Sequence, residues 1–261
     1  MFRRRRAMTP EAASIKKRTG HINERLFAEL IDGDVISGQG KTDVIDKGYN
    51  HYSVKGAKWW QIFMYVRSRF VTNTEFLEIG NVAGLIINCL DAFPEEPEKY
   101  KTDKTTAKKR LQVAMRKLKD ELCQPGMFAK FLSKGIFNAN EVDYLAVLEN
   151  KLSGKDIPID RKYFHVFSAP DVVSVLSTNL KVANSTAFGR GQMSALKVIF
   201  LYQGQNTGEL EIRVDTSHYR KARWRLNSEM ILPILRNNLA EKIIEGMQIS
   251  VYGSAIDDLS E

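Results

Sequence analysis

Cysteine is scarce in this chain, which has only Cys89 and Cys123 among its 261 residues. Two cysteines are too few for a disulfide framework, and no cysteine–histidine group has the spacing of a zinc site. No apolar run is long enough to span a bilayer, and the arginines at 3–6 are not followed by the apolar stretch of a secretory signal. These absences predict a protein of the reducing cytoplasm with no membrane partner.

The residue patterns of several enzyme classes are missing as well. The glycines between positions 33 and 40 lack the lysine and hydroxyl residue that complete a phosphate-binding loop. The four histidines are scattered without metal-ligand spacing, and neither cysteine lies in a motif for nucleophilic catalysis. Phosphate-loop, zinc and thiol chemistry are therefore not indicated by the sequence.

Acidic residues are fewer than basic ones, and the chain carries a net charge of +8. The excess is concentrated in residues 1–18, where seven lysines and arginines accompany a single acid, Glu11. We expect residues 1–18 to form a flexible basic arm and residues 19–261 to form a single domain. Two roles stay open for the arm, which are sequence-independent attraction to phosphates and service as a solubilising tail.

The most informative segment covers positions 41–56 and reads KTDVID, a short turn, then HYSVKG. β-branched and aromatic residues on both sides of Gly48, Tyr49 and Asn50 predict a β-hairpin. The hairpin carries an acid, Asp43, on its first strand and a lysine, Lys55, on its second. A carboxylate that binds a divalent cation, beside an ammonium that positions the attacking water, is the arrangement that phosphodiester hydrolysis needs.

The length of the hairpin loop decides which residue faces Asp43, because side chains alternate between the two faces of a sheet. A four-residue loop sets Asp43 opposite Val54 and leaves Lys55 on the other side of the sheet. A three-residue loop sets Asp43 opposite Lys55, and a five-residue loop sets it opposite Ser53. Either of the last two registers builds a site, and the sequence leaves the choice open.

This order of residues resembles the PD-(D/E)XK nuclease superfamily, and within it the Type II restriction endonucleases. In that family an acid precedes a hairpin partner with the pattern (D/E)-x-K, and a helix before the hairpin often donates a glutamate. Asp43 matches the first acid and Lys55 matches the lysine. The chain departs from the pattern at Thr42, which replaces a proline, and at Ser53, which stands where an acid is usual.

Two glutamates compete for the role of the helix acid. Apolar residues recur at helical spacing over positions 20–31, which predicts a helix with a buried stripe. Glu24 is the preferred donor and Glu29 the reserve; five residues apart, they lie about 140° around the helix and do not share a face. Glu24 has a second interpretation, as a first-turn charge that compensates the helix dipole.

The resemblance implies a fold and a catalytic group. The fold is mixed α/β, with a restriction-endonuclease-like core in which helices flank a mixed β-sheet, and residues 94–160 are a possible helical insertion. Mg²⁺ is bound by Asp43, helped by the Val54 carbonyl and Glu24. Lys55 stays charged near the attacking water, and Ser53 completes the catalytic group.

The resemblance also implies an activity and partners. It implies a magnesium-dependent, sequence-specific endonuclease of a restriction-modification system, hydrolysing phosphodiester bonds in double-stranded DNA. Such enzymes usually act as homodimers on symmetric sites, and a cognate DNA methyltransferase belongs to the same system. Two alternatives stay open: a structure-directed or repair nuclease of the same fold, and a non-catalytic DNA-binding protein on that fold.

Two further basic segments are candidates for contact with DNA. Residues 99–119 contain nine lysines and arginines against Asp103 and predict an amphipathic helix. Residues 218–225 combine four cations with two aromatics, and extended alternation would put Tyr219, Lys221, Arg223 and Arg225 on one face. Arginine can bind guanine bidentately in the major groove. The predicted DNA-binding residues are therefore Tyr219, Arg220, Lys221, Arg223 and Arg225.

The remaining periodicity predicts alternating helices and strands. Strands are expected at 162–167 and in a hairpin over 194–214. Helices are expected over 59–69, 75–90, 99–122, 141–152, 170–176 and from Ser228 onward, with Pro233 in the first turns of the last one.

Overall fold

The computed structural model describes residues 10–38, 40–72, 79–139, 141–149, 163–187, 193–246 and 248–259, with side chains from residue 20 onward. The fold is mixed α/β, as predicted. The chain divides into two compact units, the first comprising residues 1–57, 142–168 and 241–261 and the second comprising 58–141 and 169–240. This division describes compactness, so the single domain expected from residue 19 stays a prediction.

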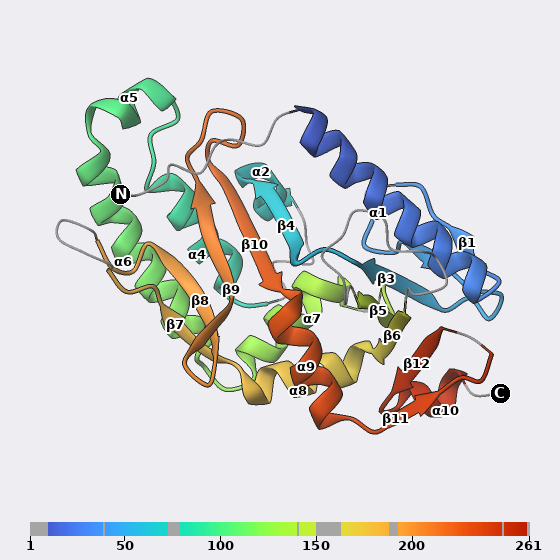
Figure 1. Ribbon diagram of the computed structural model, residues 1–261. Helices are drawn as coiled ribbons and strands as arrows, with labels where there is room; N and C mark the ends of the chain where they lie inside the picture. Colours follow the sequence, from blue (N-terminus) through green and yellow to red (C-terminus); the bar gives the residue numbers. More distant parts are fainter. Residues whose placement is uncertain are drawn as a thin grey trace, which may run out of the picture. The chain divides into compact units, whose positions relative to one another are not determined.

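The first unit is built around a seven-stranded sheet in the order β1-β2-β3-β5-β6-β12-β11 (Figure 1). β3 pairs in parallel with β5, and β6 with β12, whereas the other neighbours are antiparallel. The sheet is therefore mixed. Its elements are α1 (Pro10–Leu30), β1 (Asp34–Val35), β2 (Val44–Ile45), β3 (His51–Lys55), β5 (Tyr144–Glu149), β6 (Tyr163–Ser168), β11 (Glu241–Ile243), β12 (Ile249–Tyr252) and α10 (Ala255–Leu259).

One face of this sheet carries the core of the first unit. Tyr52 and Val54 of β3 are buried in the same apolar cluster as Phe27 of α1. The Phe27 ring lies 5.2 Å from the Tyr52 ring and 5.1 Å from the Phe164 ring, measured between centroids. Because side chains alternate along a strand, Ser53 and Lys55 project from the opposite face. The core thus fixes which face carries the candidate catalytic group.

The second unit contains an antiparallel sheet in the order β4-β10-β9-β8-β7, and α4, α6 and α7 pack against it (Figure 1). Trp224 of β10 is fully buried and stacks on Phe131 of α7 at 4.5 Å. Its elements are β4 (Trp59–Val66), α2 (Arg67–Thr72), α4 (Val82–Asp91), α5 (Pro97–Thr102), α6 (Lys104–Leu122), α7 (Met127–Phe137), α8 (Ala169–Asn179), β7 (Lys181–Asn184), β8 (Lys197–Tyr202), β9 (Gln205–Arg213), β10 (Lys221–Asn227) and α9 (Ser228–Asn238).

A glycine sets the distance between α7 and β10. A Cβ atom on Gly135 would lie only 2.1 Å from Cζ3 of the Trp224 ring. Real side chains do not approach that closely, so any larger residue at this position must push the helix away from the sheet. The tryptophan therefore holds one face of β10 against the core, and the alternate residues of the strand face the other way.

Two predicted helices are strands in the structure. Residues 59–66 form β4, and only the following residues form the helix α2. Residues 144–149 form β5, which lies between β3 and β6 and is buried along most of its length. In both segments pairing with distant strands overrides the local helical preference. The predicted helical insertion over 94–160 is wrong for the same reason, because β5 belongs to the main sheet.

The amino-terminal helix begins earlier than predicted. α1 starts at Pro10, a residue whose fixed φ angle suits the first turn of a helix. Residues 10–18 therefore belong to the helix, and the prediction of a flexible arm over all of 1–18 is wrong for them. Residues 1–9, which hold four arginines, lie outside the described residues.

The other predicted elements are present with shifted boundaries. The strand β6, the helix α8 and the hairpin of β8 and β9 are confirmed, and Pro233 lies inside α9. The expected helix over 99–122 is interrupted at Asp103, whose carboxylate accepts from the Thr106 backbone N–H at 3.0 Å and begins α6. In the described part of the chain, no helix is long and apolar enough to cross a membrane.

Candidate functional site

Of the three loop lengths considered from the sequence, the hairpin over 41–56 has the five-residue loop. Residues 46–50 connect β2 and β3. The pairs Val44–Tyr52 and Ile45–His51, continued by one residue, set Asp43 opposite Ser53, and the Asp43 backbone N–H donates to the Tyr52 carbonyl oxygen at 2.8 Å. The structure therefore adopts one of the two registers expected to bring the acid, the hydroxyl and the lysine together.

Asp46 holds this loop in shape. Its carboxylate accepts hydrogen bonds from the Asn50 backbone N–H and side-chain amide, both at 2.9 Å, and from the Tyr52 hydroxyl at 2.7 Å. Burial disfavours the charged carboxylate, but these hydrogen bonds outweigh burial and lower the pKa of Asp46. Tyr49 takes a left-handed φ of 63° at the tip. The register is therefore fixed by contacts within the hairpin itself.

Asp43, Ser53 and Lys55 form one contact group. Oδ2 of Asp43 accepts from the Val54 backbone N–H at 2.7 Å, from the Ser53 hydroxyl at 3.2 Å and from Lys55 Nζ at 3.2 Å. Lys55 Nζ also donates to Ser53 Oγ at 2.6 Å and to the Val54 carbonyl oxygen at 3.3 Å. The ammonium thus has three oxygen acceptors for its three N–H groups.

The group is partly accessible to solvent. The side chains of Asp43 and Lys55 are 24% and 22% exposed, whereas Ser53 is fully buried. Oδ1 of Asp43 has no hydrogen-bond partner among the residues that the structure describes. A carboxylate with one anchored and one available oxygen, beside a charged lysine, can bind a cation and orient a phosphate or a water molecule.

The structure does not bring Glu24 into contact with this group. Its carboxylate accepts from the His21 ring on the same helix, Nδ1 to Oε2 at 2.9 Å. The residue that reaches the end of β3 is its neighbour Asn23, which is buried: a Cβ on Gly56 would lie 2.3 Å from Asn23 Nδ2. α1 therefore runs close to the strand end after Lys55, with Glu24 one residue beyond the contact point.

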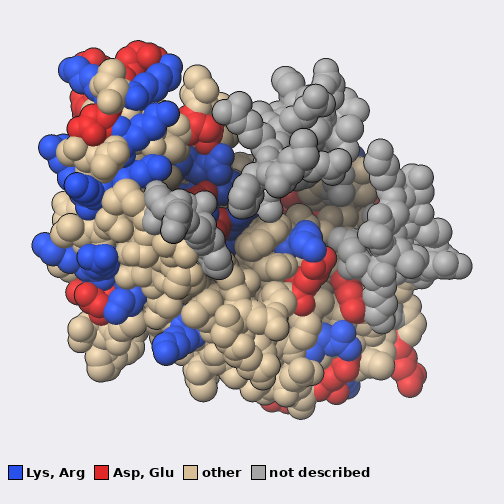
Figure 2. All heavy atoms as spheres, turned by 60° about the vertical axis from the view of Figure 1, so that its left-hand side comes forward, with Lys and Arg blue, Asp and Glu red and all other residues tan. Residues whose placement is uncertain are grey.

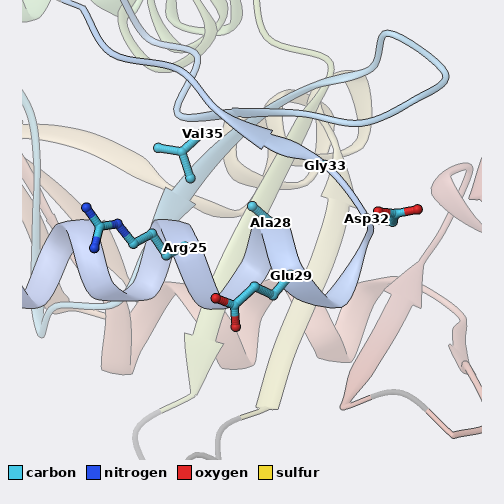
Figure 3. A pocket seen from close by; sticks show the side chains of 6 residues that line it. All are labelled: Arg25, Ala28, Glu29, Asp32, Gly33 and Val35. Carbon is cyan, nitrogen blue, oxygen red and sulfur yellow. The ribbon is translucent and has the colours of Figure 1, made fainter.

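Glu29 lies in a different place. With Arg25 and Asp32 it lines a surface pocket of about 420 Å³ at the carboxyl end of α1 (Figure 3). Neither Asp43 nor Lys55 lines this pocket. The reserve acid is therefore directed to a different surface from the hairpin group in this conformation, and Glu24 remains the better placed of the two.

Acidic ligands are sparse around the hairpin. Over the described ranges, no group of three or more histidine, cysteine, aspartate or glutamate side chains is arranged to hold a metal ion. Position 53 contributes a serine hydroxyl to the contact group and no carboxylate. Asp43 is accordingly the one carboxylate in the contact group formed with Ser53 and Lys55.

The basic segment over 218–225 is a strand only in part. β10 begins at Lys221, and Lys221, Arg223 and Arg225 are partly exposed on one face while Trp224 between them is buried. Tyr219 precedes the strand, and its hydroxyl donates to the Pro94 carbonyl oxygen at 2.8 Å. The prediction that Tyr219 shares the strand face is therefore wrong, because the extended backbone starts two residues later.

Arg220 also lies before the strand and has acidic partners. Its backbone takes a left-handed φ of 53°. The guanidinium pairs with Asp91 at 2.8 Å and with Glu95 at 3.3 Å, and its side chain is only 15% exposed. Contact between Arg220 and DNA stays a prediction.

Two glutamates of β9 were not singled out from the sequence. Glu209 and Glu211 face Arg225 and Arg223 across the β9–β10 pair. Lys197 of β8 contacts both carboxylates, at 2.8 Å and 2.5 Å. Burial disfavours ionisation of Glu211, but Lys197 and Arg223 outweigh burial and lower its pKa to about 2. The available signal was the alternation of acids in β9, which becomes meaningful only once its register against β10 is known.

The basic face of α6 has a different environment. Lys104, Lys109, Arg116 and Lys117 are exposed, and none of them has an ion-pair partner within the described ranges. Ala107, Leu111, Met115 and Leu118 form the buried stripe of the same helix. Lysine and arginine side chains are prominent on the surface seen in Figure 2, which brings the α5–α6 side of Figure 1 forward. This confirms the predicted amphipathic character of the segment.

A second polar group occupies the first unit, centred on buried His165. Its ring nitrogens contact Glu149 at 3.0 Å and the Tyr252 hydroxyl at 2.9 Å. Glu241 accepts from both Tyr252 at 2.5 Å and Ser250 at 2.7 Å. The group joins β5, β6, β11 and β12 through side chains, so its polar atoms are used in holding the sheet together.

Comparison with known proteins adds no assignment. The chain matches no protein-family model, and no curated protein matches it in sequence.

Proposed function

We propose that this chain is a magnesium-dependent endonuclease that hydrolyses phosphodiester bonds in double-stranded DNA at specific sequences. The observation that carries the proposal is the convergence of Asp43, Ser53 and Lys55 on one face of a hairpin, within hydrogen-bond distance of one another. The order of these residues along the chain resembles the restriction endonucleases, which supports the same activity.

The oxygen atoms at the hairpin suit magnesium. Mg²⁺ prefers oxygen ligands and is usually held by one or two carboxylates, with waters and substrate phosphates completing its shell. The Asp43 carboxylate and the Val54 carbonyl are such donors, and both lie within 3.3 Å of Lys55 Nζ. Glu24 is the third proposed donor and would exchange its contact with His21 for the ion. When bound, Mg²⁺ polarises the phosphodiester and lowers the pKa of a coordinated water.

Lys55 supplies the fixed positive charge of the site. Its ammonium is held beside Asp43 and the Ser53 hydroxyl, so it would lie close to a phosphate oxygen or water molecule bound at Asp43. Negative charge builds up on the phosphate oxygens during attack, and a preorganised cation stabilises it. Ser53 cannot replace a carboxylate as a metal ligand of equal charge, and its role here is to orient the lysine.

The wider setting follows from the resemblance. We propose action in the cytoplasm as a homodimer on a symmetric DNA site, alongside a DNA methyltransferase that protects the same sequence. Arg223 and Arg225 of β10 are the proposed base-contacting residues, with Arg220 and Lys221 beside them, and the cations of α6 are proposed to contact phosphates.

One observation favours a second candidate function. The serine at position 53 leaves the contact group with a single carboxylate, which Lys55 neutralises as an ion pair at 3.2 Å. A protein that binds DNA without cutting it would keep such a pair intact. A structure-directed or repair nuclease has the same site and differs only in the substrate that it cleaves.

Incubation of unmethylated plasmid DNA with the purified protein and Mg²⁺ separates these functions. Discrete fragments support the proposed endonuclease, and cleavage confined to branched or single-stranded DNA identifies the repair nuclease. Asp43→Asn should abolish the fragments, whereas Asp32→Asn, at an exposed acid away from the hairpin group, should not. Tight binding to the plasmid without any magnesium-dependent cleavage would assign the non-catalytic function.

A further inference from the structure

The charged face of the second unit's sheet holds one arginine in an unusually defined position. Arg225 on β10 donates through Nε, at 2.8 Å, and through Nη2 to the same oxygen of Glu209. Its guanidinium carbon lies 4.4 Å from the centroid of the Trp59 ring. A carboxylate at one edge and an aromatic ring against one face fix both the direction and the plane of the guanidinium.

Glu209 is itself held from its other side. Its second oxygen accepts from Lys197 Nζ at 2.8 Å, and its side chain is only 8% exposed. Lys197 lies on β8, Glu209 on β9 and Arg225 on β10, so these contacts link three adjacent strands through the glutamate. This chain of contacts limits the freedom of Arg225 before any ligand arrives, which lowers the entropic cost of binding one.

The contacts leave a particular edge of Arg225 available. Nε and Nη2 are directed at Glu209, whereas Nη1 has no hydrogen-bond partner in the described part of the chain, and 21% of the side chain is exposed. The outer edge of the guanidinium, formed by Nη1 and the second hydrogen of Nη2, can therefore donate two parallel hydrogen bonds. Two acceptors side by side in one plane are what the major-groove edge of guanine offers, at O6 and N7.

The charge on this face argues against a simple phosphate contact. Glu209 and Glu211 contact Lys197, Arg223 and Arg225, so most of the positive charge here is already neutralised. Attraction to phosphates depends on the number of cations available to displace counterions. An arginine whose long-range charge is mostly neutralised but whose donors stay directed is better suited to a base edge than to the backbone.

We propose that Arg225 is a preorganised reader of guanine in duplex DNA, and that Glu209 and Trp59 are its positioning residues. The recognition sequence of the protein then contains at least one G·C pair that depends on this arginine. This inference rests on the DNA binding in the proposed function but does not depend on cleavage.

The test measures binding without chemistry. The full chain is mixed, in buffer without Mg²⁺, with a pool of duplexes that have a randomised central region, and the bound duplexes are sequenced. We expect enrichment of sites with a fixed G·C pair. Replacing that guanine with 7-deazaguanine, which lacks N7 but pairs normally with cytosine, should weaken binding of the unaltered protein by about 5-fold or more.

Three variants separate positioning from simple structural support. Arg225→Lys keeps the charge but removes the fork, so it should abolish the guanine preference while its affinity for random duplex changes by less than about 2-fold. Glu209→Gln should release the arginine, which weakens the preference yet raises affinity for random duplex. Lys117→Gln on α6 is the matched control and should lower affinity for all sequences alike. Circular dichroism melting confirms that each variant is folded.

The outcomes distinguish the inference from the proposed function. A selected site without any G·C pair, insensitivity to 7-deazaguanine, or an unchanged preference in Arg225→Lys would overturn the inference alone. A loss of affinity for all sequences in Glu209→Gln would show that this glutamate only supports the fold, and would overturn its positioning role. Selection of a guanine-containing site by a protein that never cleaves DNA would remove the nuclease proposal and leave the inference standing.

Discussion

β10 and α6 are both basic elements of the same unit, but their cations have opposite surroundings. Arg223 and Arg225 of β10 are paired with the buried carboxylates of β9 and are mostly covered. Lys109 and Lys117 of α6 are exposed and have no ion-pair partner among the described residues. The sequence alone describes both regions simply as basic. The ion pairs hold the guanidinium groups of β10 in fixed directions, whereas the exposed cations of α6 are suited to long-range attraction of phosphates.

The same distinction separates specificity from affinity in protein–DNA complexes. Contacts to phosphates are numerous, depend on salt and carry no direct sequence information, whereas contacts to base edges are few and require fixed geometry. We therefore expect β10 to determine which sequence is bound and α6 to determine how tightly any sequence is bound. The following predictions test this division, beginning with the variant that removes chemistry and leaves both regions unchanged.

Lys55→Ala should reduce cleavage by at least about 10³-fold, because removing a preorganised charge or donor from a transition state costs roughly that much. Binding to duplex DNA should stay within about 3-fold of the unaltered protein, since neither β10 nor α6 is touched. Cleavage is measured on plasmid with Mg²⁺, and binding by fluorescence anisotropy without it. Lys47→Ala is the control, because that lysine lies in the loop of the same hairpin but pairs with the exposed Asp32 and not with Asp43. Normal cleavage by Lys55→Ala would remove the lysine from the site.

Joint replacement of Arg220, Arg223 and Arg225 by alanine should change site choice. Removing a good bidentate interaction with a base costs roughly 1–3 kcal/mol of discrimination. Joint replacement of Lys104, Lys109 and Lys117 by glutamine is the comparison, and it should lower affinity for cognate and scrambled duplexes equally. Cleavage patterns and competition binding distinguish the two results. If the arginine variant keeps its site and the lysine variant changes it, the assignment of the two regions is reversed.

Acidification should remove the stability that Glu211 contributes through its ion pairs with β8 and β10, and should leave the contribution of exposed helix pairs unchanged. Glu211 has its pKa lowered to about 2 from 4.5, so its contribution is fully present above pH 4.5 and is lost as the pH falls toward 2. The contribution is about 3 kcal/mol at neutral pH. Chemical denaturation between pH 7 and 3 should therefore show the difference in stability between the unaltered protein and Glu211→Gln shrinking as the pH falls. Glu98→Gln, at an exposed helix pair, should show no such convergence.

The candidate site was more predictable than the recognition surface, because it is built from neighbours in sequence. The order of Asp43, Ser53 and Lys55 narrowed the hairpin to two useful registers, but the loop length could not be chosen. The deciding contacts, from Asn50 and Tyr52 to Asp46, depend on a backbone turn around Tyr49. That turn uses a left-handed conformation, which local propensity assigns to glycine or asparagine before tyrosine.

The errors in the fold have a common physical origin. Residues 59–66 were predicted as helix although tryptophan, isoleucine and phenylalanine favour strands, because the segment is a nearly continuous apolar run without period-2 alternation. Residues 144–149 contain good helix formers and become a strand only because β3 and β6 lie on either side of them. The pairing of Glu209 with Arg225 is likewise a matter of register between strands, which one sequence does not specify.

Removal of residues 1–9 should have the smallest effect, and its character matters more than its size. These residues contain four arginines and no acid. No acidic residue within the segment offsets their charge, so we expect them to act like the exposed cations of α6 and not like the paired arginines of β10. For every phosphate that the shortened chain no longer neutralises, the dependence of log affinity on log salt should flatten by about 0.9, which gives at most about 3.6 for four arginines. Affinity should fall equally for cognate and scrambled duplexes at low salt and converge with the full chain at high salt. A matched control replaces the four arginines by glutamine without shortening the chain, and it should reproduce the truncation. If either variant changed which sequence is preferred, the amino-terminal arginines would have to enter a groove, and specificity could no longer be assigned to β10 alone.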